Sequence, residues 1–266
     1  MLDRLKNDDP VIRAAAADAL RELKPPEGAG VLAEAYRLGQ RDVTYVARAA
    51  ALGALVAYGA TDAVPVLNEA LADKDWAVRL RAAALLKGLD PASDADVRIR
   101  PAPTSYPADF YRAPRMVTPP VSTQIYLEVD RGLIQIELAV LDAPLTVENF
   151  ISLARRKFFD GIAFHRVVPN FVVQGGDPRS DGEGGPGYTI RDELNERPYL
   201  RGTVGMALDW ADTGGSQFFI THAPQPQLDD RYTVFGRVID GMDIVDQIQP
   251  WDVIRRTIVW DGDTRK

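Results

Sequence analysis

The 266-residue chain contains no cysteine and only two histidines, His165 and His222. The missing thiols exclude disulfides, thiolate catalysis, iron–sulfur clusters and cysteine-built zinc sites. Two histidines are too few for most histidine-built metal centres, so we expect no metal. We also expect no organic cofactor, and the chemistry of any site must therefore come from other side chains.

Long apolar runs and a basic excess are missing as well. The most apolar stretch, residues 46–60, is interrupted by Arg48 and falls short of the ~18 apolar residues that a membrane helix needs. The formal net charge is −7, and neither the first hundred residues nor the remainder has a surplus of Lys and Arg. We therefore expect a soluble folded protein that neither inserts into membranes nor binds nucleic acid.

The beginning of the sequence lacks the apolar core of a signal peptide. This favours the cytoplasm. If an original N-terminal signal is missing from this sequence, the periplasm or secretion is the alternative.

The composition changes along the chain. A length of 266 residues favours two domains at about 150 residues per domain. Alanine is concentrated in the first hundred residues, whereas most glycines follow residue 100. We predict an all-α domain over 1–99, a proline-rich linker over 100–120 and a strand-rich domain over 121–266.

The predicted linker contains six prolines, each of which fixes φ and lacks an amide donor. Its aromatic residues Tyr106, Phe110 and Tyr111 are too apolar for a freely solvated segment. We therefore predict an extended segment that lies against one or both domains. A flexible tether is the alternative.

One pattern recurs three times in the first hundred residues, in segments that begin with Asp9, Thr44 and Asp75. These residue types cap helices, because their side-chain oxygens accept from free amides of the first turn. An arginine follows four residues later in each copy, at Arg13, Arg48 and Arg79, and the two spacings of 35 and 31 residues fit a two-helix unit.

The segment LADKDWAVRLRAAALLKGL at 71–89 resembles HEAT repeats, whose units carry the pattern D-x-x-V-R-x-x-A-A-x-x-L. The resemblance covers residues 1–95 and implies a helical array that binds another protein. A plain alanine-rich helical bundle is the alternative.

From residue 122 onward the pattern changes to alternation of apolar and polar residues. The segments TQIYLEV and GLIQIELAV are separated by the turn at 130–132, which predicts a β-hairpin. Further short strand-like segments follow, separated by turns, and only a few helices are indicated. This pattern suggests an antiparallel barrel.

Four motifs in this region are distinctive: FHRVVPNFVVQGGDP at 164–178, GTVGMA at 202–207, GGSQFFIT at 214–221 and LDDRYTVFGRVIDGMDIVDQI at 228–248. Together they resemble the cyclophilin peptidyl-prolyl cis–trans isomerases over residues 122–266. The resemblance implies an eight-stranded antiparallel β-barrel with two capping helices and a substrate groove on its outer face. It also implies an enzyme that accelerates rotation about Xaa–Pro bonds in protein clients and so assists protein folding.

This reaction makes specific demands on a site. An Xaa–Pro amide isomerises over a barrier of about 18–20 kcal/mol, because the twisted state loses amide resonance. No bond breaks, so a catalyst needs only a site that binds the twisted imide more tightly than either planar form. The resemblance implies that Arg166 donates to the imide nitrogen, with Phe171 and Gln174 as further catalytic residues. The substrate-binding residues that it implies are Val172, Ala207, Leu208, Gln217, Phe219, Leu228 and Tyr232.

The chain departs from the best-known cyclophilins at four of these positions or beside them. Val172, Leu208 and Tyr232 stand where those members have methionine, asparagine and histidine. Gln227 replaces the tryptophan of cyclosporin-sensitive members, so we expect weak cyclosporin binding. An alternative function is a scaffold that binds proline segments with little or no turnover and acts mainly through its repeats.

Residues 182–187 fit the pattern G-x-G-x-x-G, but a dinucleotide site requires a strand before it and a helix after it. Pro186 lies inside the motif, and the strand-like residues 188–190 follow. We therefore interpret this segment as a glycine-rich turn beside the groove.

Overall fold

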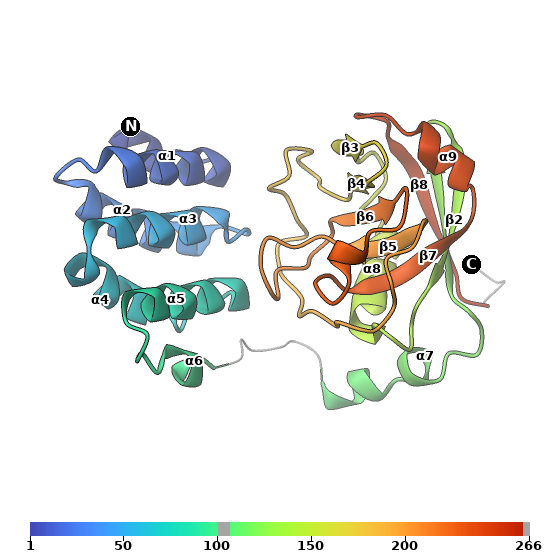
Figure 1. The fold of residues 1–266 in the computed structure, drawn as a ribbon, viewed down its shortest axis with the longest axis horizontal. Coiled ribbons are helices and arrows are strands. Elements are labelled where there is room, and N and C mark those ends of the chain that lie inside the picture. The colour runs from blue at the N-terminus through green and yellow to red at the C-terminus, as the bar shows by residue number, and fades with distance from the viewer. Residues whose placement is uncertain (101–106, 263–266) are drawn as a thin grey trace. The chain divides into compact units, whose positions relative to one another are not determined.

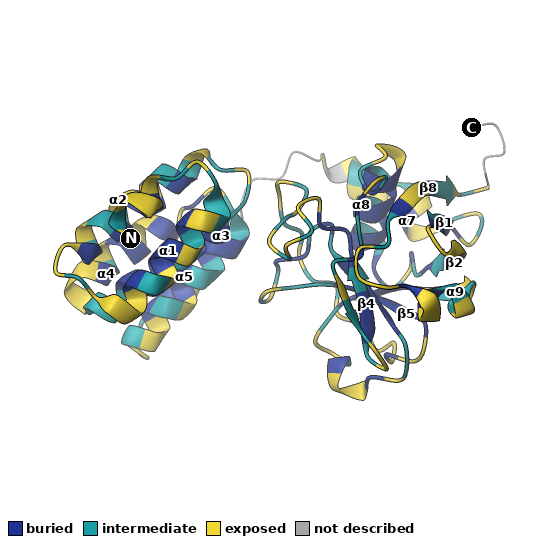
Figure 2. Cartoon of the chain, turned by 90° about the horizontal axis from the view of Figure 1, so that it is seen from above, coloured by how far each residue is buried: buried dark blue, intermediate teal, exposed yellow. Residues whose placement is uncertain are grey.

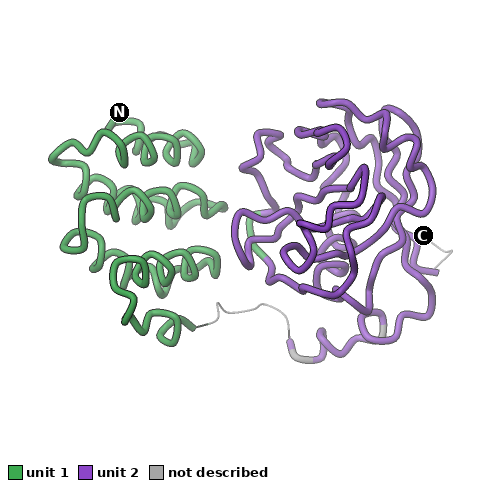
Figure 3. Tube along the Cα trace, viewed as in Figure 1, with its two compact units in different colours: residues 1–104, 187–189 green, residues 105–186, 190–266 purple. Residues whose placement is uncertain are grey.

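The computed structural model describes residues 1–100 and 107–262, so Tyr106 and the rest of 101–106 lie outside the described residues. The chain divides into two compact units (Figure 3). Unit 1 comprises residues 1–104 and 187–189, and unit 2 comprises residues 105–186 and 190–266. None of the helices in the described ranges has both the length and the hydrophobicity needed to cross a membrane.

Unit 1 is helical, as predicted for the N-terminal region, and its helices stack in layers (Figure 1). Helix α3 lies at the centre, and nearly all of its residues are buried against α1, α2 and α5 (Figure 2). The many alanines allow this close approach. The long helices are α1 Pro10–Leu23, α2 Gly28–Leu38, α3 Val46–Leu55, α4 Ala60–Ala70 and α5 Trp76–Leu89, with the short helices η1 Leu2–Lys6 and α6 Ala95–Arg98 at the ends and η2 Gly39–Arg41 and η3 Val56–Tyr58 between them.

The first two recurring arginines are buried and bind acidic residues in the loops between helices. Arg13 on α1 forms an ion pair with Asp42, which lies in the loop before α3. Arg48 on α3 is fully buried and pairs with Asp73 and Asp75 in the loop before α5. Each arginine thus connects its own copy of the pattern to the next copy.

The third arginine binds main-chain carbonyls instead of carboxylates. Arg79 on α5 donates to the carbonyl oxygens of Asp73 and Arg100, each at 2.5 Å. Arg100 follows the short helix α6, so the last arginine binds the segment that ends the stack.

The helix caps agree only partly with the predictions. Asp9 caps α1, because its carboxylate accepts from the Val11 amide at 2.9 Å. Asp75 occupies the N-cap position of α5, but its side chain makes no capping hydrogen bond and pairs with Arg48 instead. For Asp75, the carboxylate thus binds a buried cation rather than the free amides that we predicted. Thr44 lies one residue before the N-cap of α3, and its hydroxyl accepts from the Val46 amide at 3.4 Å, as predicted.

The described residues of unit 2 form eight strands in one curled antiparallel sheet, with the order β3-β4-β6-β5-β7-β2-β1-β8. Its two edges approach each other, since the Gly161 and Phe164 amides donate to the carbonyls of Ile254 and Asp252 at 2.7 and 2.9 Å. The sheet is thus curled, and β3 and β8 themselves do not pair to close a regular barrel. The strands are β1 Gln124–Val129, β2 Gly132–Leu138, β3 Arg166–Val168, β4 Val172–Gly175, β5 Thr203–Met206, β6 Phe218–Thr221, β7 Val234–Asp240 and β8 Ile254–Trp260.

The main core of unit 2 lies inside the curl, where the central strands are deeply buried (Figure 2). Helices α8, Pro144–Arg155, and α9, Met242–Gln247, pack against the sheet, and the short η5, Pro226–Leu228, precedes β7. Phe150 on α8 stacks on Phe159 with ring centroids 4.6 Å apart. The aromatic residues of this core are Phe150, Phe159, Phe164, Phe218 and Phe235.

The described part of the predicted linker forms short helices, η4 Ala108–Arg112 and α7 Pro114–Val117, where we expected an extended chain. Proline is tolerated at the first helical position, where its missing amide would have no partner, and this explains Pro114 at the start of α7. Arg115 binds Glu148 of α8 through two hydrogen bonds of 3.0 and 2.9 Å, and Met116 is buried. This part of the segment therefore packs on unit 2.

Replacing Arg48 by alanine should strongly destabilise unit 1, because the fully buried Asp73 carboxylate loses its cation. Removing one partner of a buried ion pair costs about 3–5 kcal/mol. Arg37→Ala is a matched control, since Arg37 and Glu69 form an exposed pair worth about 1 kcal/mol or less. Urea unfolding followed by far-UV circular dichroism measures both free energies. Equal unfolding midpoints for the two variants would contradict the structural role of Arg48.

Candidate active site

Strand register brings three predicted site residues into one row. Arg166 on β3 pairs with Gln174 on β4, and Gln174 pairs with Phe219 on β6. The row continues through Gly205 on β5 to Val234 on β7. Side chains alternate along a strand, so residues directly opposite one another point to the same face. Residues distant in the sequence are therefore neighbours on the outer face of the sheet.

A chain of hydrogen bonds orients the polar side of this row. Arg166 Nη1 lies 3.4 Å from Gln174 Oε1, and Gln174 Nε2 donates to Gln217 Oε1 at 3.0 Å. Gln217 Nε2 in turn donates to two main-chain carbonyls of the glycine turn at 182–184, at 2.8 and 2.9 Å. The Arg166 guanidinium also lies over the Phe171 ring, 5.6 Å from its centroid. The exposed guanidinium is therefore supported by both an amide and an aromatic face.

The glycine turn has no helix after it, which agrees with its interpretation as a turn. Its carbonyl oxygens face Gln217. A dinucleotide site would instead direct main-chain amides from a helix N-terminus toward phosphate.

A second, smaller apolar cluster lies on the outer face beside Arg166, and we call it the outer cluster. Phe219 is its central ring, 5% exposed, with Tyr232 edge-on at 5.6 Å and 90°. Such a surface can hold an apolar ring such as pyrrolidine. The outer cluster consists of Val172, Tyr199, Phe219, Leu228 and Val234, with the partly buried Phe171, Ala207 and Tyr232 packed against it.

The side chains of Ala207 and Leu208 pack against different clusters. The Leu208 side chain packs against the main core of unit 2 and does not join the outer cluster. The Ala207 amide already donates to the Gln217 carbonyl at 3.0 Å, so this amide is not free for a bound peptide. The remaining main-chain groups of the pair and the Ala207 methyl group beside the outer cluster can serve a substrate.

Sequence reasoning missed three residues of the site: Tyr199, Gly205 and Val234. Val234 could have been found, because it lies two residues after Tyr232, and residues two apart along an extended chain point to the same side. Tyr199 lies in an irregular segment before β5, where no periodic pattern indicates its direction.

His165 directly precedes Arg166 but does not extend the polar chain. Neither of its ring nitrogens has a hydrogen-bond partner among the described residues. Burial lowers the pKa of His165; the charge of Asp177 opposes this shift, and that of Arg166 adds to it. Burial lowers the pKa of His222 as well. Residues 1–100 and 107–262 hold no group of three or more His, Asp or Glu side chains placed to bind a metal.

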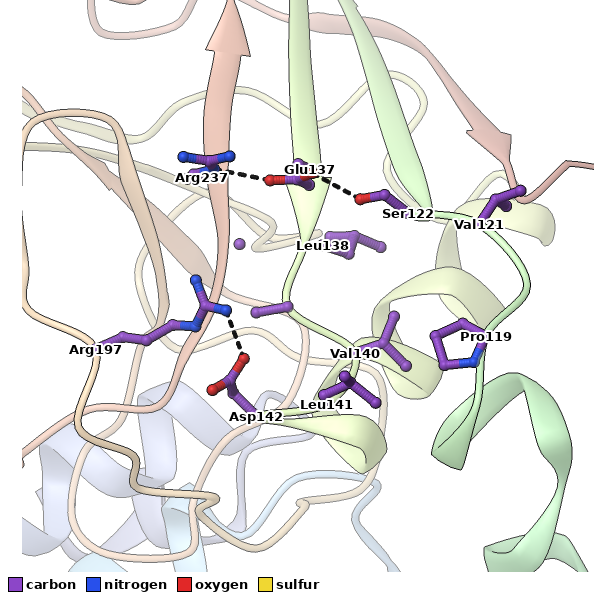
Figure 4. Close-up of a pocket in the computed structure, with 12 residues that line it drawn as sticks. Pro119, Val121, Ser122, Glu137, Leu138, Val140, Leu141, Asp142, Arg197 and Arg237 are labelled. Carbon is purple, nitrogen blue, oxygen red and sulfur yellow. Dashed lines mark hydrogen bonds and ion pairs between the residues drawn. The ribbon is translucent and has the colours of Figure 1, made fainter.

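A separate pocket of about 480 Å³ lies between β2, β7 and the segment Pro119–Ser122 (Figure 4). Its two arginines are already paired with carboxylates, Arg237 with Glu137 at 2.8 Å and Arg197 with Asp142 at 2.7 Å. The side-chain charges of the pocket therefore cancel. None of the predicted site residues lines it.

Arg166 and the outer cluster thus lie side by side on the outer face of the curled sheet. The family described as cyclophilin type peptidyl-prolyl cis-trans isomerase/CLD matches residues 124–260. The chain belongs to this family and is a peptidyl-prolyl cis–trans isomerase, an enzyme class that binds proline-containing substrates. The match does not include the helices of unit 1.

Individual relatives agree with this assignment. A peptidyl-prolyl cis-trans isomerase of Synechococcus elongatus is 51% identical over 118 residues, which cover 44% of this chain and 81% of the relative. Peptidyl-prolyl cis-trans isomerase B of Bacillus subtilis is 45% identical over 141 residues, which cover 52% of this chain and 99% of the relative. The crystal structure of a cyclophilin type isomerase of Cryptosporidium parvum has a TM-score of 0.50 at 29% identity, covering 53% of this chain and 98% of that chain.

His165 should make the folded protein less stable as the pH falls. The unfolded chain takes up a proton near the ordinary histidine pKa of about 6.5, whereas burial lowers the folded-state pKa. The stability that the neutral ring contributes is thus present above about pH 6.5 and is lost as the pH falls toward the folded-state pKa. Thermal midpoints between about pH 7.5 and 5.5 should fall less in His165→Asn than in the parent. Parallel pH profiles would show that His165 does not contribute.

Proposed function

We propose that Arg166 is the donor that stabilises the twisted Xaa–Pro bond during isomerisation. The observation that carries this proposal is the row in which Arg166, Gln174 and Phe219 lie side by side across three strands. As the bond twists, the lone pair of the imide nitrogen localises, and a guanidinium donor can bind it. The donor is always charged, since arginine does not lose its proton in proteins. Stabilisation is therefore stronger for the twisted state than for either planar form.

The neighbouring residues divide the remaining tasks. The Phe171 ring lies under the Arg166 guanidinium carbon, and Gln174 accepts from the guanidinium. Phe219 offers the surface for the pyrrolidine ring, and Tyr232 forms the polar edge of this surface. The other residues assigned to substrate binding are Val172, Ala207, Leu208, Gln217 and Leu228.

The energy required is modest. Raising the rate from ~10⁻² to ~10 s⁻¹ takes about 4 kcal/mol, at 1.36 kcal/mol for each tenfold change. A hydrogen bond to a charged donor contributes about 1.5–3 kcal/mol. The rest must come from fixing the proline ring on the outer cluster, which no single substitution removes completely.

Arg166→Ala should lower kcat/KM on an Xaa–Pro peptide by at least tenfold, which corresponds to about 1.4 kcal/mol. The variant should stay folded, because the Arg166 side chain is exposed and fills no part of the core. Arg256→Ala is a matched control, since Arg256 is also an exposed strand arginine but lies on β8. A protease-coupled assay measures kcat/KM for both variants. Equal values would show that Arg166 is not the catalytic donor.

The same assay tests the scaffold alternative. A parent protein that binds the peptide without accelerating its isomerisation would be a proline-binding scaffold.

For unit 1 we propose a HEAT-like repeat array that binds a protein partner, within a helical domain over 1–99 that precedes the isomerase domain over 121–266. The repeated arginines support this proposal, because Arg13 and Arg48 bind equivalent loops in successive copies. The ends of the array support it too, since Leu5 of η1 and Ala95 of α6 are buried there. Terminal elements of this kind cap repeat arrays and keep them soluble.

Removing residues 1–106 should separate the two roles. Turnover of a short Xaa–Pro peptide should stay within about twofold, because every assigned site residue lies in unit 2. Acceleration of a protein whose refolding is limited by proline isomerisation should fall by about tenfold, as the helical surface no longer concentrates the client. Equal losses on the peptide and the protein, or no loss on either, would contradict a role of the repeats in client binding.

A further inference from the structure

Tyr199 packs directly on the central ring of the outer cluster. It is 1% exposed, and its ring stacks on Phe219 with centroids 5.5 Å apart and planes 25° apart. Phe219 also has Tyr232 edge-on. The ring that faces the substrate is therefore held between aromatic neighbours, and Tyr199 is the more deeply buried of the two.

Tyr199 itself is fixed at several points. Its hydroxyl donates to the Tyr232 carbonyl at 3.1 Å, and its amide donates to Asp229 Oδ1 at 2.8 Å. Its carbonyl accepts from the Gln225 amide at 2.7 Å. Burial raises the pKa of the Tyr199 hydroxyl, which keeps this group protonated as a donor. The hydroxyl contact thus fixes the outer end of the Tyr199 ring, and the other two hydrogen bonds fix the main chain of this residue.

Gly205 provides the space in which the two rings meet. It lies opposite Phe219 in the sheet register. A Cβ atom at this position would lie 2.3 Å from Tyr199 Oη and 2.5 Å from Phe219 Cζ, both impossible distances. Stacking of Tyr199 on Phe219 therefore requires that residue 205 has no side chain.

We propose that Tyr199 is a positioning residue of the isomerase site, which holds the Phe219 ring at a fixed distance from Arg166. This inference rests on the proposed roles of Arg166 and Phe219. Gln174 lies between these two residues in the register, so the sheet fixes their main chains and Tyr199 fixes the remaining freedom of the ring. The twisted and planar forms of the substrate are related by rotation about the imide bond. A site distinguishes them only if the Phe219 ring that contacts the substrate keeps a fixed orientation.

Tyr199→Leu tests the role of the stacked ring. This variant keeps an apolar side chain but removes both the ring and the hydroxyl. We expect kcat/KM on an Xaa–Pro peptide to fall by about tenfold, with a change in peptide Kd of less than about threefold. Tyr199→Phe keeps the stacking and loses only the hydrogen bond to Tyr232, so its kcat/KM should stay within about threefold of the parent.

Phe159→Leu is the matched control for general loss of packing. Phe159 is a fully buried aromatic residue of the main core and has no place in the outer cluster. Both leucine variants should lower the thermal midpoint, and activities are compared per folded protein. A purely structural role of Tyr199 predicts the same activity for both leucine variants, and that result would overturn the proposal.

The Phe219 ring provides a readout that does not depend on turnover. Its aromatic ¹H and ¹³C resonances should shift and broaden in Tyr199→Leu, because the ring current of Tyr199 is lost and a second rotamer becomes populated. They should stay in place in Phe159→Leu. Unchanged Phe219 resonances in Tyr199→Leu would also overturn the proposal, whereas an inactive parent would refute only the proposed function of the site.

Gly205→Ala, on strand β5, tests the same contact between Tyr199 and Phe219. Gly205 does not have a positive φ, so alanine fits the main chain and only its Cβ intrudes between the rings. We expect a loss of kcat/KM that is smaller in the Tyr199→Leu background, since one of the two clashes is then absent. Equal losses in both backgrounds would show that the two residues do not act on one ring.

Discussion

The pairing register of β3, β4 and β6 is the constraint on which the active site depends. A slip of one residue would reverse the faces of a strand, placing Phe218 outside and Phe219 inside. Phe218 and Val173 are fully buried in the main core, and burying such a side chain contributes about 1.5–3 kcal/mol. The apolar core therefore determines the register, and the register places Arg166, Gln174 and Phe219 in one row. The chemistry on the outer face is thus maintained by residues that never meet a substrate.

Unit 1 also has an apolar core, and it contains buried ion pairs in addition. Its helices are rich in alanine, which buries little apolar area per residue, and the buried ion pairs of Arg13 and Arg48 connect successive copies. Buried pairs contribute little net stability against an apolar alternative, but breaking one is costly. In this unit they determine which loop meets which helix. Helices that resemble one another need this specificity, because they could otherwise pair in the wrong order.

The sequence predicted the helical region, the antiparallel sheet and most of the site, since contiguous motifs contain Arg166, Phe171, Gln174 and Phe219. It did not predict contacts that depend on a particular side-chain direction. Asp75 could either cap its helix or bind a cation, and only the approach of Arg48 decides between them. Leu208 is adjacent to Ala207, yet its side chain turns to the main core. Tyr199 lies in an irregular segment, where its direction follows from packing that no local pattern encodes.

The two carbonyls of the glycine turn at 182–184 have a consequence for the polarity of the whole site. They can only accept hydrogen bonds, so the amide group of Gln217 must direct its nitrogen toward them and its oxygen toward Gln174. Gln174 must then direct its oxygen toward Arg166. The turn thus sets the direction of two successive amide dipoles, those of Gln217 and Gln174. A change in the backbone of the turn would reverse both amides and present the Gln174 nitrogen to the guanidinium, without any substitution at Gln174 or Gln217.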